Sequence, residues 1–317
     1  MTAARVVGLH VLVLALLFAA QFVVSDYDQL TLTRMMVLAV YAVGYNLLFG
    51  YAGLLSLGHA LFFGAGLYGA GLAAYHFEAG VPLAFVAGLA ASLLVSLLIG
   101  LIALRTRGVS FMIVTMMFAQ AGFLALLYFS RWTGGDQGLP LPAAARSFTV
   151  AGLTIDLADA GTRYNVAVAL LAVAIGIGLL VVMRPGGRVL VAIRENEERT
   201  RMLGYDVFAH KLKAFVISGG LSGAAGAAYG LMFAYIGATF ASIQYSIEVL
   251  LFTLLGGAGT LLGPVLGTIL MFYLIDKASE VTSAYLLVVG FVLVGLILWF
   301  PKGILGTVRD RWARWLP

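Results

Sequence analysis

Ser56 and His59 are the two residues of this chain whose types and spacing come nearest to a catalytic pair. Residues three positions apart share one face of a helix, so a histidine base could activate a serine nucleophile for hydrolysis. Such pairs are common by chance, however, and no Gly-x-Ser-x-Gly elbow surrounds Ser56. The alternatives are a structural histidine that is hydrogen-bonded to a neighbouring helix, and one that lines or braces a path through a bundle.

Other chemistries can be tested against the remaining polar residues. The histidines at positions 10, 59, 76 and 210 are scattered and the chain has no cysteine, so no metal site is predicted. The lysines at positions 211, 213, 277 and 302 never follow a glycine, so the Walker A pattern of an ATP-binding loop is absent. We therefore expect no enzymatic activity and no cofactor bound by this chain.

The composition indicates that most of the chain lies in a lipid bilayer. Of its 317 residues, 62% are hydrophobic and only 10% are charged, against about 25% charged in soluble domains. With a mean hydropathy of +1.04, the chain is predicted to be an integral membrane protein, one polytopic domain over residues 1–317 in contact with lipid. The net charge of +5 is attributed to loops on the cytoplasmic side, and no nucleic-acid partner is expected.

Apolar runs of about 20 residues are long enough to cross a bilayer. The sequence contains nine, at residues 6–24, 32–50, 53–75, 82–104, 109–129, 164–183, 214–236, 246–274 and 284–300. The run 246–274 would form a helix of about 43 Å, too long for a hydrocarbon layer of about 30 Å. Because glycines and a proline interrupt it, we expect two shorter segments that meet near 256–263. The predicted fold is all-α, with about ten membrane segments.

The basic residues give the orientation, because arginine and lysine favour the cytoplasmic side. With this topology, 14 of the 19 lie inside and both termini are cytoplasmic. The other five lie outside: Arg34, Arg131, Arg146, Arg163 and Lys277. The outer loop, 130–163, holds a turn-rich stretch at 133–140 and an alternating stretch at 147–157 that predicts a small hairpin.

The acidic residues bear on the energy source of transport. Glu248 is the only acidic residue within a predicted segment, and it lies near the outer end. Proton-coupled carriers place carboxylates in the middle of the membrane. Their absence there argues against a proton-driven carrier, whereas sodium coupling through backbone oxygens stays open.

The inner loop, 184–213, is the most charged stretch of the chain. The residues Pro185, Gly186 and Gly187 are expected to close the preceding helix, and residues 189–206 to form one or two short helices that stop at Gly204. A mixed-charge helix with an apolar stripe suits docking into a groove on a partner, while a solvated loop that only sets topology is the alternative. The stripe consists of Val191, Ile193, Met202 and Leu203.

The stretch 56–71 carries five glycines among large apolar residues. Small residues four apart let helices approach closely, and they could also let two bundles slide or expose backbone to a substrate. With the segment starting at Gly53, His59 would lie about 9 Å along a helix, near the inner face.

Four stretches together resemble the LivM-type permeases, the membrane subunits of ABC importers for branched-chain amino acids. They are GYNLLFGYAGLLSLGHALFFGAGLYGA (44–70), TGGDQGL (133–139), AIRENEERTRMLGYDVFAHKLKAFVISGGLSGAAGAAYG (192–230) and TLLGGAGTLLGPVLGT (253–268). The resemblance implies a type II-like ABC importer fold in a bacterial inner membrane. It also implies partners: a homologous permease, two ATP-binding subunits that carry ATP and magnesium, and a periplasmic or lipid-anchored substrate-binding protein. Similar permeases serve urea, short amides and other small solutes, and a stand-alone secondary carrier is the alternative from another class.

The resemblance also assigns candidate roles to residues. The contact with the ATP-binding subunits would use Arg194, Glu195, Asn196, Glu198, Arg199, Met202, Leu203, Gly204 and Tyr205, although the "EAA" letters of other ABC importers are absent. Candidates for the translocation path and its gate are Asn46, Ser56, His59, Phe62, Gly256, Gly257 and Gly259. Candidates for docking at the outer loop are Gly134, Gly135 and Asp136.

Overall fold

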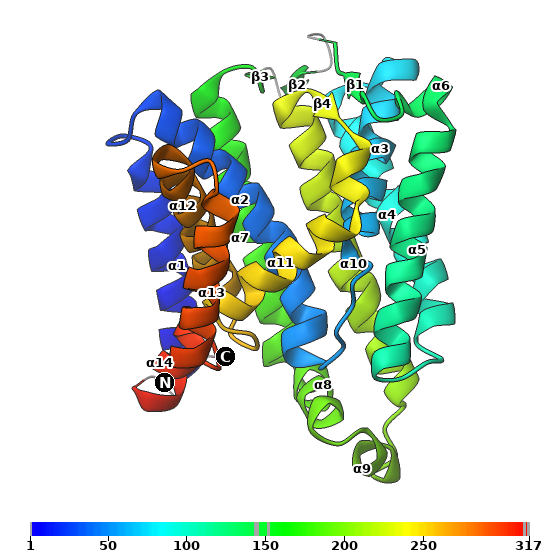
Figure 1. The fold of residues 1–317 in the computed structure, drawn as a ribbon, viewed down its shortest axis with the longest axis vertical. Helices are drawn as coiled ribbons and strands as arrows, with labels where there is room; N and C mark the ends of the chain where they lie inside the picture. The colour runs from blue at the N-terminus through cyan, green and yellow to red at the C-terminus, as the bar shows by residue number, and fades with distance from the viewer. Residues whose placement is uncertain (1, 143–145, 151–152, 313–314, 316–317) are drawn as a thin grey trace.

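A computed structural model describes residues 2–142, 146–150, 153–312 and 315, and it is a bundle of helices with short strands at one end (Figure 1). The long helices of the first half are α1 (Thr2–Ala20), α2 (Asp26–Asn46), α3 (His59–His76), α4 (Val81–Ala103) and α5 (Val109–Tyr128). The second half contains α7 (Ala160–Met183), α10 (Val207–Phe233), α11 (Ile243–Gly256), α12 (Gly263–Val281) and α13 (Tyr285–Trp299). The short helices are α6 (Ser130–Thr133), α8 (Pro185–Glu195), α9 (Glu197–Met202) and α14 (Ile304–Arg311).

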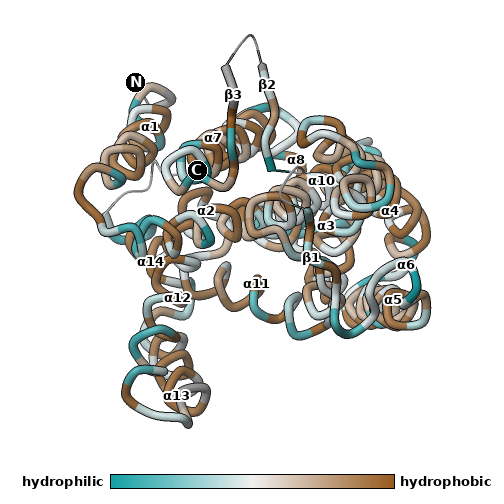
Figure 2. Tube along the Cα trace, turned by 90° about the horizontal axis from the view of Figure 1, so that it is seen from above, coloured by the Kyte–Doolittle hydropathy of each residue, from teal (hydrophilic) through white to brown (hydrophobic). Residues whose placement is uncertain are grey.

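Several helices of this bundle are long enough to span a membrane. Within the described part of the chain, five helices are long and apolar enough to cross a bilayer: Asp26–Tyr51, Val81–Ala103, Val109–Tyr128, Ala160–Met183 and Val207–Phe233. The apolar windows of α2 and α10 are 89% buried, against 17% in α5. Viewed from above, α2, α3 and α10 lie toward the centre, and α1 and α13 lie at the rim (Figure 2). The predicted helical membrane class is confirmed at this level.

The predicted break in the run 246–274 is confirmed. Helix α11 ends at Gly256 and α12 begins at Gly263, and Gly257 and Gly259 have φ angles of +122° and +75° that other residues rarely adopt. A Cβ on Gly256 would lie 1.7 Å from the backbone oxygen of Gly263. Glycine therefore both turns the chain and lets the two helices pack backbone against backbone.

The expected helical start at Gly53 is wrong. A π-helical turn, Leu47–Tyr51, continues α2, residues 52–58 are not helical, and α3 begins at His59. Gly53 has a φ angle of +71°, and a Cβ on Gly58 would lie 2.6 Å from the backbone oxygen of Thr115 in α5. His59 is therefore the first residue of its helix and does not lie 9 Å along it.

The 184–213 loop contains more helix than expected. Pro185 occupies the start of α8, where its missing N–H costs nothing, so the Pro-Gly-Gly stretch begins a helix as well as ending α7. The Asn196 side chain caps α9, and Asp206 caps α10. Helix α10 starts at Val207, seven residues before the predicted boundary, so Lys211 and Lys213 belong to a long helix. The two short helices and the stop at Gly204, whose φ is +88°, are confirmed.

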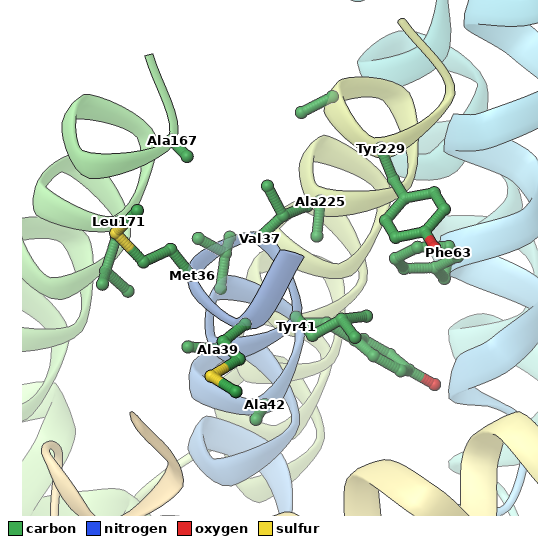
Figure 3. Close-up of a cluster of buried hydrophobic side chains, with 14 of the residues drawn as sticks. Met36, Val37, Ala39, Tyr41, Ala42, Phe63, Ala167, Leu171, Ala225 and Tyr229 are labelled. Atoms are coloured by element: carbon green, nitrogen blue, oxygen red, sulfur yellow. The ribbon is translucent and has the colours of Figure 1, made fainter. Parts of the chain in front are cut away.

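The centre of the bundle packs α2 against α3, α7 and α10. In Figure 3, Tyr41 of α2 points toward Phe63 of α3 and Tyr229 of α10, and Leu171 of α7 lies on the other side. The rings of Tyr41 and Phe63 are 5.1 Å apart. Small residues bring α3 and α10 together, since a Cβ on Gly66 would lie 2.0 Å from the backbone oxygen of Gly223.

Short strands lie at the opposite end of the molecule from α8 and α9 (Figure 1). Strands β2 (Ser147–Val150) and β3 (Leu153–Asp156) pair in antiparallel register, Ser147 opposite Asp156, which confirms the predicted hairpin. Strand β1 (Leu139–Pro140) pairs with β4 (Tyr235–Ile236). The acidic residues Asp26, Asp28, Asp276 and Glu280 were expected in loops outside the predicted segments, which is wrong: they lie in the first turn of α2 and the last part of α12.

Candidate functional site

The loop between α11 and α12 (residues 257–262) is held by the side chain of Asn46. The Asn46 Nδ2 atom donates to the backbone oxygen of Thr260 at 3.0 Å, and Oδ1 accepts from the backbone N–H of Gly259 at 2.9 Å. Asn46 is fully buried at the end of α2. Both halves of its amide are therefore used to fix the backbone at the break predicted from the glycines.

The π-helical turn after α2 touches the same loop. A Cβ on Gly50 would lie 2.4 Å from the backbone nitrogen of Gly259, so glycine is needed for this approach. The extra residue of a π turn shifts the chain out of the regular helical ladder, a feature that often accompanies functional sites. The end of α2 and the loop 257–262 thus form one packed unit.

Two arginines hold this unit from the side of α8 and α14. Arg194, in the last turn of α8, donates from Nη1 to the backbone oxygen of Gly50 at 2.5 Å. Arg309 of α14 donates from Nη1 to the backbone oxygen of Gly259 at 2.6 Å. A Cβ on Gly259 would lie 3.1 Å from Arg194 Nη1, so the two arginines flank one loop. The predicted coupling residue Arg194 and the predicted gate residues Asn46, Gly257 and Gly259 therefore lie together.

Helix α9 is held by ion pairs whose partners could not be predicted from the sequence. Glu198 forms an ion pair with Arg107 at 2.7 Å and with Arg201 at 3.2 Å. Glu197 pairs with Arg201 and with the buried Lys211 of α10. The hydrogen bond from Arg107 lowers the pKa of the Glu198 carboxyl. Arg107 lies between α4 and α5, so these ion pairs tie α9 to two other parts of the bundle.

The apolar stripe predicted for the 184–213 loop is divided into a part that packs on the bundle and a part that is exposed. Ile193 is buried with Val189 and Val207, and Val191 is half-buried, so they attach α8 to the bundle. Met202 and Leu203 are 85% and 71% exposed. The expectation of one continuous docking stripe is wrong, because one part packs internally and only the end of α9 is free to meet another protein.

The remaining residues predicted to contact a partner divide in the same way. Asn196 is occupied as a cap, and Arg194 reaches into the bundle through its guanidinium. Both are nevertheless partly open to solvent, and they are exposed together with Glu195, Glu198, Arg199, Gly204 and Tyr205. A side chain at position 204 would meet open space. Glycine is favoured there because the backbone is in the left-handed region.

His59 lies in a closed network between α2, α3 and α10. Its Nε2 atom is 2.8 Å from Ser218 Oγ, and that hydroxyl donates to the backbone oxygen of Gly44 at 2.6 Å. A hydroxyl has one proton to donate, so Ser218 accepts from His59, which places the imidazole proton on Nε2. Tyr45 and Phe62 pack edge-on against the ring, at 4.8 and 5.2 Å.

Ser56 is not joined to His59 in this arrangement. The Ser56 hydroxyl accepts from the backbone N–H of Gly58 at 3.2 Å. Ser56 and His59 are both fully buried. Helix α3 is tied instead to α11, because the N–H of Ala60 donates to Ser246 Oγ at 2.8 Å. The geometry gives no support to a serine nucleophile, and Ser56, His59 and Phe62 belong to the packed interior.

The predicted docking residues of the outer loop form a tight turn. Gly134 and Gly135 have φ angles of +76° and +58°, and Asp136 is exposed. The Tyr235 hydroxyl donates to the backbone oxygen of Gln137 at 3.0 Å, which attaches the turn to β4. The turn therefore presents Asp136 from a fixed backbone.

The sequence aligns with known proteins over nearly its whole length. The family model described as a permease component of branched-chain amino acid transport systems matches residues 29–298. The high-affinity branched-chain amino acid transport permease protein LivM of Salmonella typhimurium is 28% identical over 94% of this chain and 74% of its own length. The corresponding protein of Escherichia coli is 29% identical over 95% of this chain and 75% of its own length. No solved structure matches the chain at a significant level. The chain belongs to the family of permease components of branched-chain amino acid transport systems.

Proposed function

We propose that this chain is the permease subunit of an ATP-driven importer of branched-chain amino acids and forms half of the translocation path. The observation that carries the proposal is the family match over residues 29–298, together with two branched-chain amino acid permeases that align with more than nine-tenths of the chain. A branched-chain amino acid is a zwitterion without net charge. Its path needs small polar groups and backbone oxygens, and no fixed counter-charge.

ATP hydrolysis would take place on two separate ATP-binding subunits, which hold the ATP and magnesium. The exposed Met202 and Leu203 at the end of α9 offer these subunits an apolar contact, surrounded by charged residues. A movement of α8 would reach the membrane interior through the hydrogen bond from Arg194 to Gly50. The loop 257–262, held by Asn46, is the element such a movement would displace, and we assign it to the inner gate.

The proposed topology is about ten membrane segments of a type II-like importer with both termini in the cytoplasm. Three features support it: α8 and α9 lie at the end opposite the strands, the start of α1 and helix α14 lie toward the α8 end, and most basic residues fall on that side (Figure 1). A homologous permease would complete the path. A periplasmic or lipid-anchored substrate-binding protein would deliver substrate at the turn around Asp136.

Reconstitution tests the proposal directly. The chain is co-expressed with the proposed partner subunits and purified, and uptake of radiolabelled leucine is measured in proteoliposomes with ATP inside or outside. We expect co-purified ATPase subunits and uptake that requires both ATP and the substrate-binding protein. Uptake by the single chain, driven by an ion gradient, would contradict the proposal. Uptake of urea or a short amide in place of leucine would keep the ATP-driven class and overturn the substrate.

A further inference from the structure

An apolar cavity of about 620 Å³ lies between α4, α7 and α10, away from the loop 257–262. Its lining is wholly hydrophobic apart from backbone, from Val81 and Leu157 at the end that carries the strands to Leu93 and Ile177 deeper in the bundle. Val173, a lining residue of α7, is 59% exposed. The cavity therefore opens between α4 and α7 on the outer side of the bundle.

The composition of the cavity does not suit the proposed substrate. An amino acid carries an ammonium and a carboxylate, and each costs several kcal/mol to bury without a partner. Along α7 the lining runs from Val166 to Ile177, about 16 Å of helix at 1.5 Å per residue. That length is about half of the hydrocarbon thickness of a bilayer. An acyl chain from one leaflet matches both the length and the chemistry.

Two arginines lie at the strand end of this cavity. Arg163 donates from Nη1 to the backbone oxygen of Met232, a lining residue, at 3.4 Å. The backbone oxygen of Arg146 accepts from the N–H of Leu157, also a lining residue. Figure 2 shows the hairpin that follows Arg146 beside the start of α7. The Arg163 guanidinium and the backbone of Arg146 thus lie at the end of the cavity where the polar head of a bound lipid would lie.

These arginines have unused hydrogen-bonding capacity. The Nε atoms of both Arg146 and Arg163 are buried and have no hydrogen-bond partner. Their positive charges repel each other, and Arg34 stacks on the same Phe233 ring as Arg163. Asp159, the carboxylate closest in sequence to Arg163, attracts it electrostatically but is hydrogen-bonded to the N–H of Thr162 as the cap of α7. Asp156, which lies opposite Ser147 in the hairpin, accepts from the N–H of Ala158. Among the described residues, neither Arg146 nor Arg163 takes part in an ion pair.

We propose that this cavity is a binding site for an anionic phospholipid, with an acyl chain between α4 and α7 and the headgroup phosphate on Arg146 and Arg163. A phosphate would neutralise the two repelling charges and accept from both buried Nε atoms. The bound lipid would fill the space that separates α7 from α4 and α10. It would also hold the β2–β3 hairpin through Arg146 and through Phe148, two residues further on, which lines the cavity.

The test uses the full chain, purified in detergent with the subunits that accompany it and then stripped of lipid. Native mass spectrometry and thermal unfolding are followed as dioleoylphosphatidylglycerol or dioleoylphosphatidylcholine is added. We expect at least about tenfold tighter binding of the anionic lipid and a higher Tm with it, a factor that corresponds to about 1.4 kcal/mol. Equal binding and equal Tm with the two lipids would overturn the proposal.

Variants locate the site. The double variant R146Q/R163Q should lose the preference for the anionic lipid, whereas R146K/R163K should keep most of it and R131Q, on the exposed α6, all of it. Ala169→Phe, at an exposed lining position, should weaken both lipids. If R146Q/R163Q keeps the preference, the site is elsewhere. If it binds both lipids like wild type but loses stimulation by the substrate-binding protein, the arginines contact that protein and the lipid assignment is overturned.

Discussion

The guanidinium of Arg194 donates a hydrogen bond of 2.5 Å to the backbone oxygen of Gly50, and through it the 184–213 loop reaches the interior of the bundle. Gly50 lies in the π-helical turn that continues α2, and that turn rests on the loop 257–262. A residue predicted to contact a partner therefore also bonds to the backbone beside the proposed gate. If α8 contacts the ATP-binding subunits as proposed, a movement of α8 would reach the proposed gate through this hydrogen bond.

Arg194→Ala should uncouple ATP hydrolysis from transport. Loss of a charged hydrogen bond costs about 1.5–3 kcal/mol, so we expect leucine uptake to fall about tenfold or more while basal ATP hydrolysis persists. Both rates are measured on the same proteoliposomes. Arg188→Ala, at an exposed position of the same helix, is the matched control and should leave the two rates unchanged. Uptake at the wild-type rate in Arg194→Ala would show that Gly50 is not on the coupling route.

Asn46→Ala should destabilise the protein, because it leaves the N–H of Gly259 and the oxygen of Thr260 buried without partners. Each unsatisfied group costs about 1–3 kcal/mol. We expect the Tm in detergent to fall by several degrees, about 2–4 °C for each kcal/mol in a chain of this size class. Asn165→Ala, at an exposed position of α7, removes the same side chain without these partners and should leave the Tm unchanged. Equal Tm values for the two variants would contradict the role of Asn46.

Segment lengths, glycine positions and hydrophobic alternation predicted much of this fold. The excess length and the glycines of 246–274 predicted the break between α11 and α12, and alternation in 147–157 predicted the β2–β3 hairpin. The start of α3 was missed because the glycines at 53 and 58 lie in one apolar run, where glycine fits close helix packing as well as a break. Residues 52–58 are held out of a helix by contacts with α5 and α8 at Gly58 and Gly53, which lie far away in the sequence.

The candidate site shows the same limit. The residues Asn46, Gly257 and Gly259 could be selected from motifs, but their meeting with Arg194 and Arg309 depends on packing between segments far apart in the chain. The partners Arg107 and Lys211 of α9 were missed for that reason. Their only sequence signal was an excess of basic residues at the inner ends of the segments, which topology alone also explains.

Gly259→Ala should impair both folding stability and transport, because the backbone there has a φ angle of +75° and lies against Gly50. A left-handed conformation costs about 1–2 kcal/mol for alanine, and the close contact adds to it. We expect a lower Tm and reduced leucine uptake. Gly176→Ala in α7, where an added Cβ meets nothing within 4 Å, is the control and should keep or raise the Tm. A wild-type Tm in Gly259→Ala would contradict the geometry assigned to the loop.

The ion pair between Glu198 and Arg107 should make the attachment of α9 sensitive to acid. Arg107 lowers the pKa of Glu198 below its ordinary 4.5, so the stabilising effect is present above that value and is lost as pH falls through the lower pKa of the folded state. Since the chain has no cysteine, a spin label on Arg199→Cys reports the mobility of α9 alone. Mobility should rise below about pH 4.5 in this background, whereas with Glu198→Gln added the label should already be more mobile at pH 7 and respond less to acid. Identical pH profiles with and without Glu198→Gln would remove this ion pair from the account of how α9 is held.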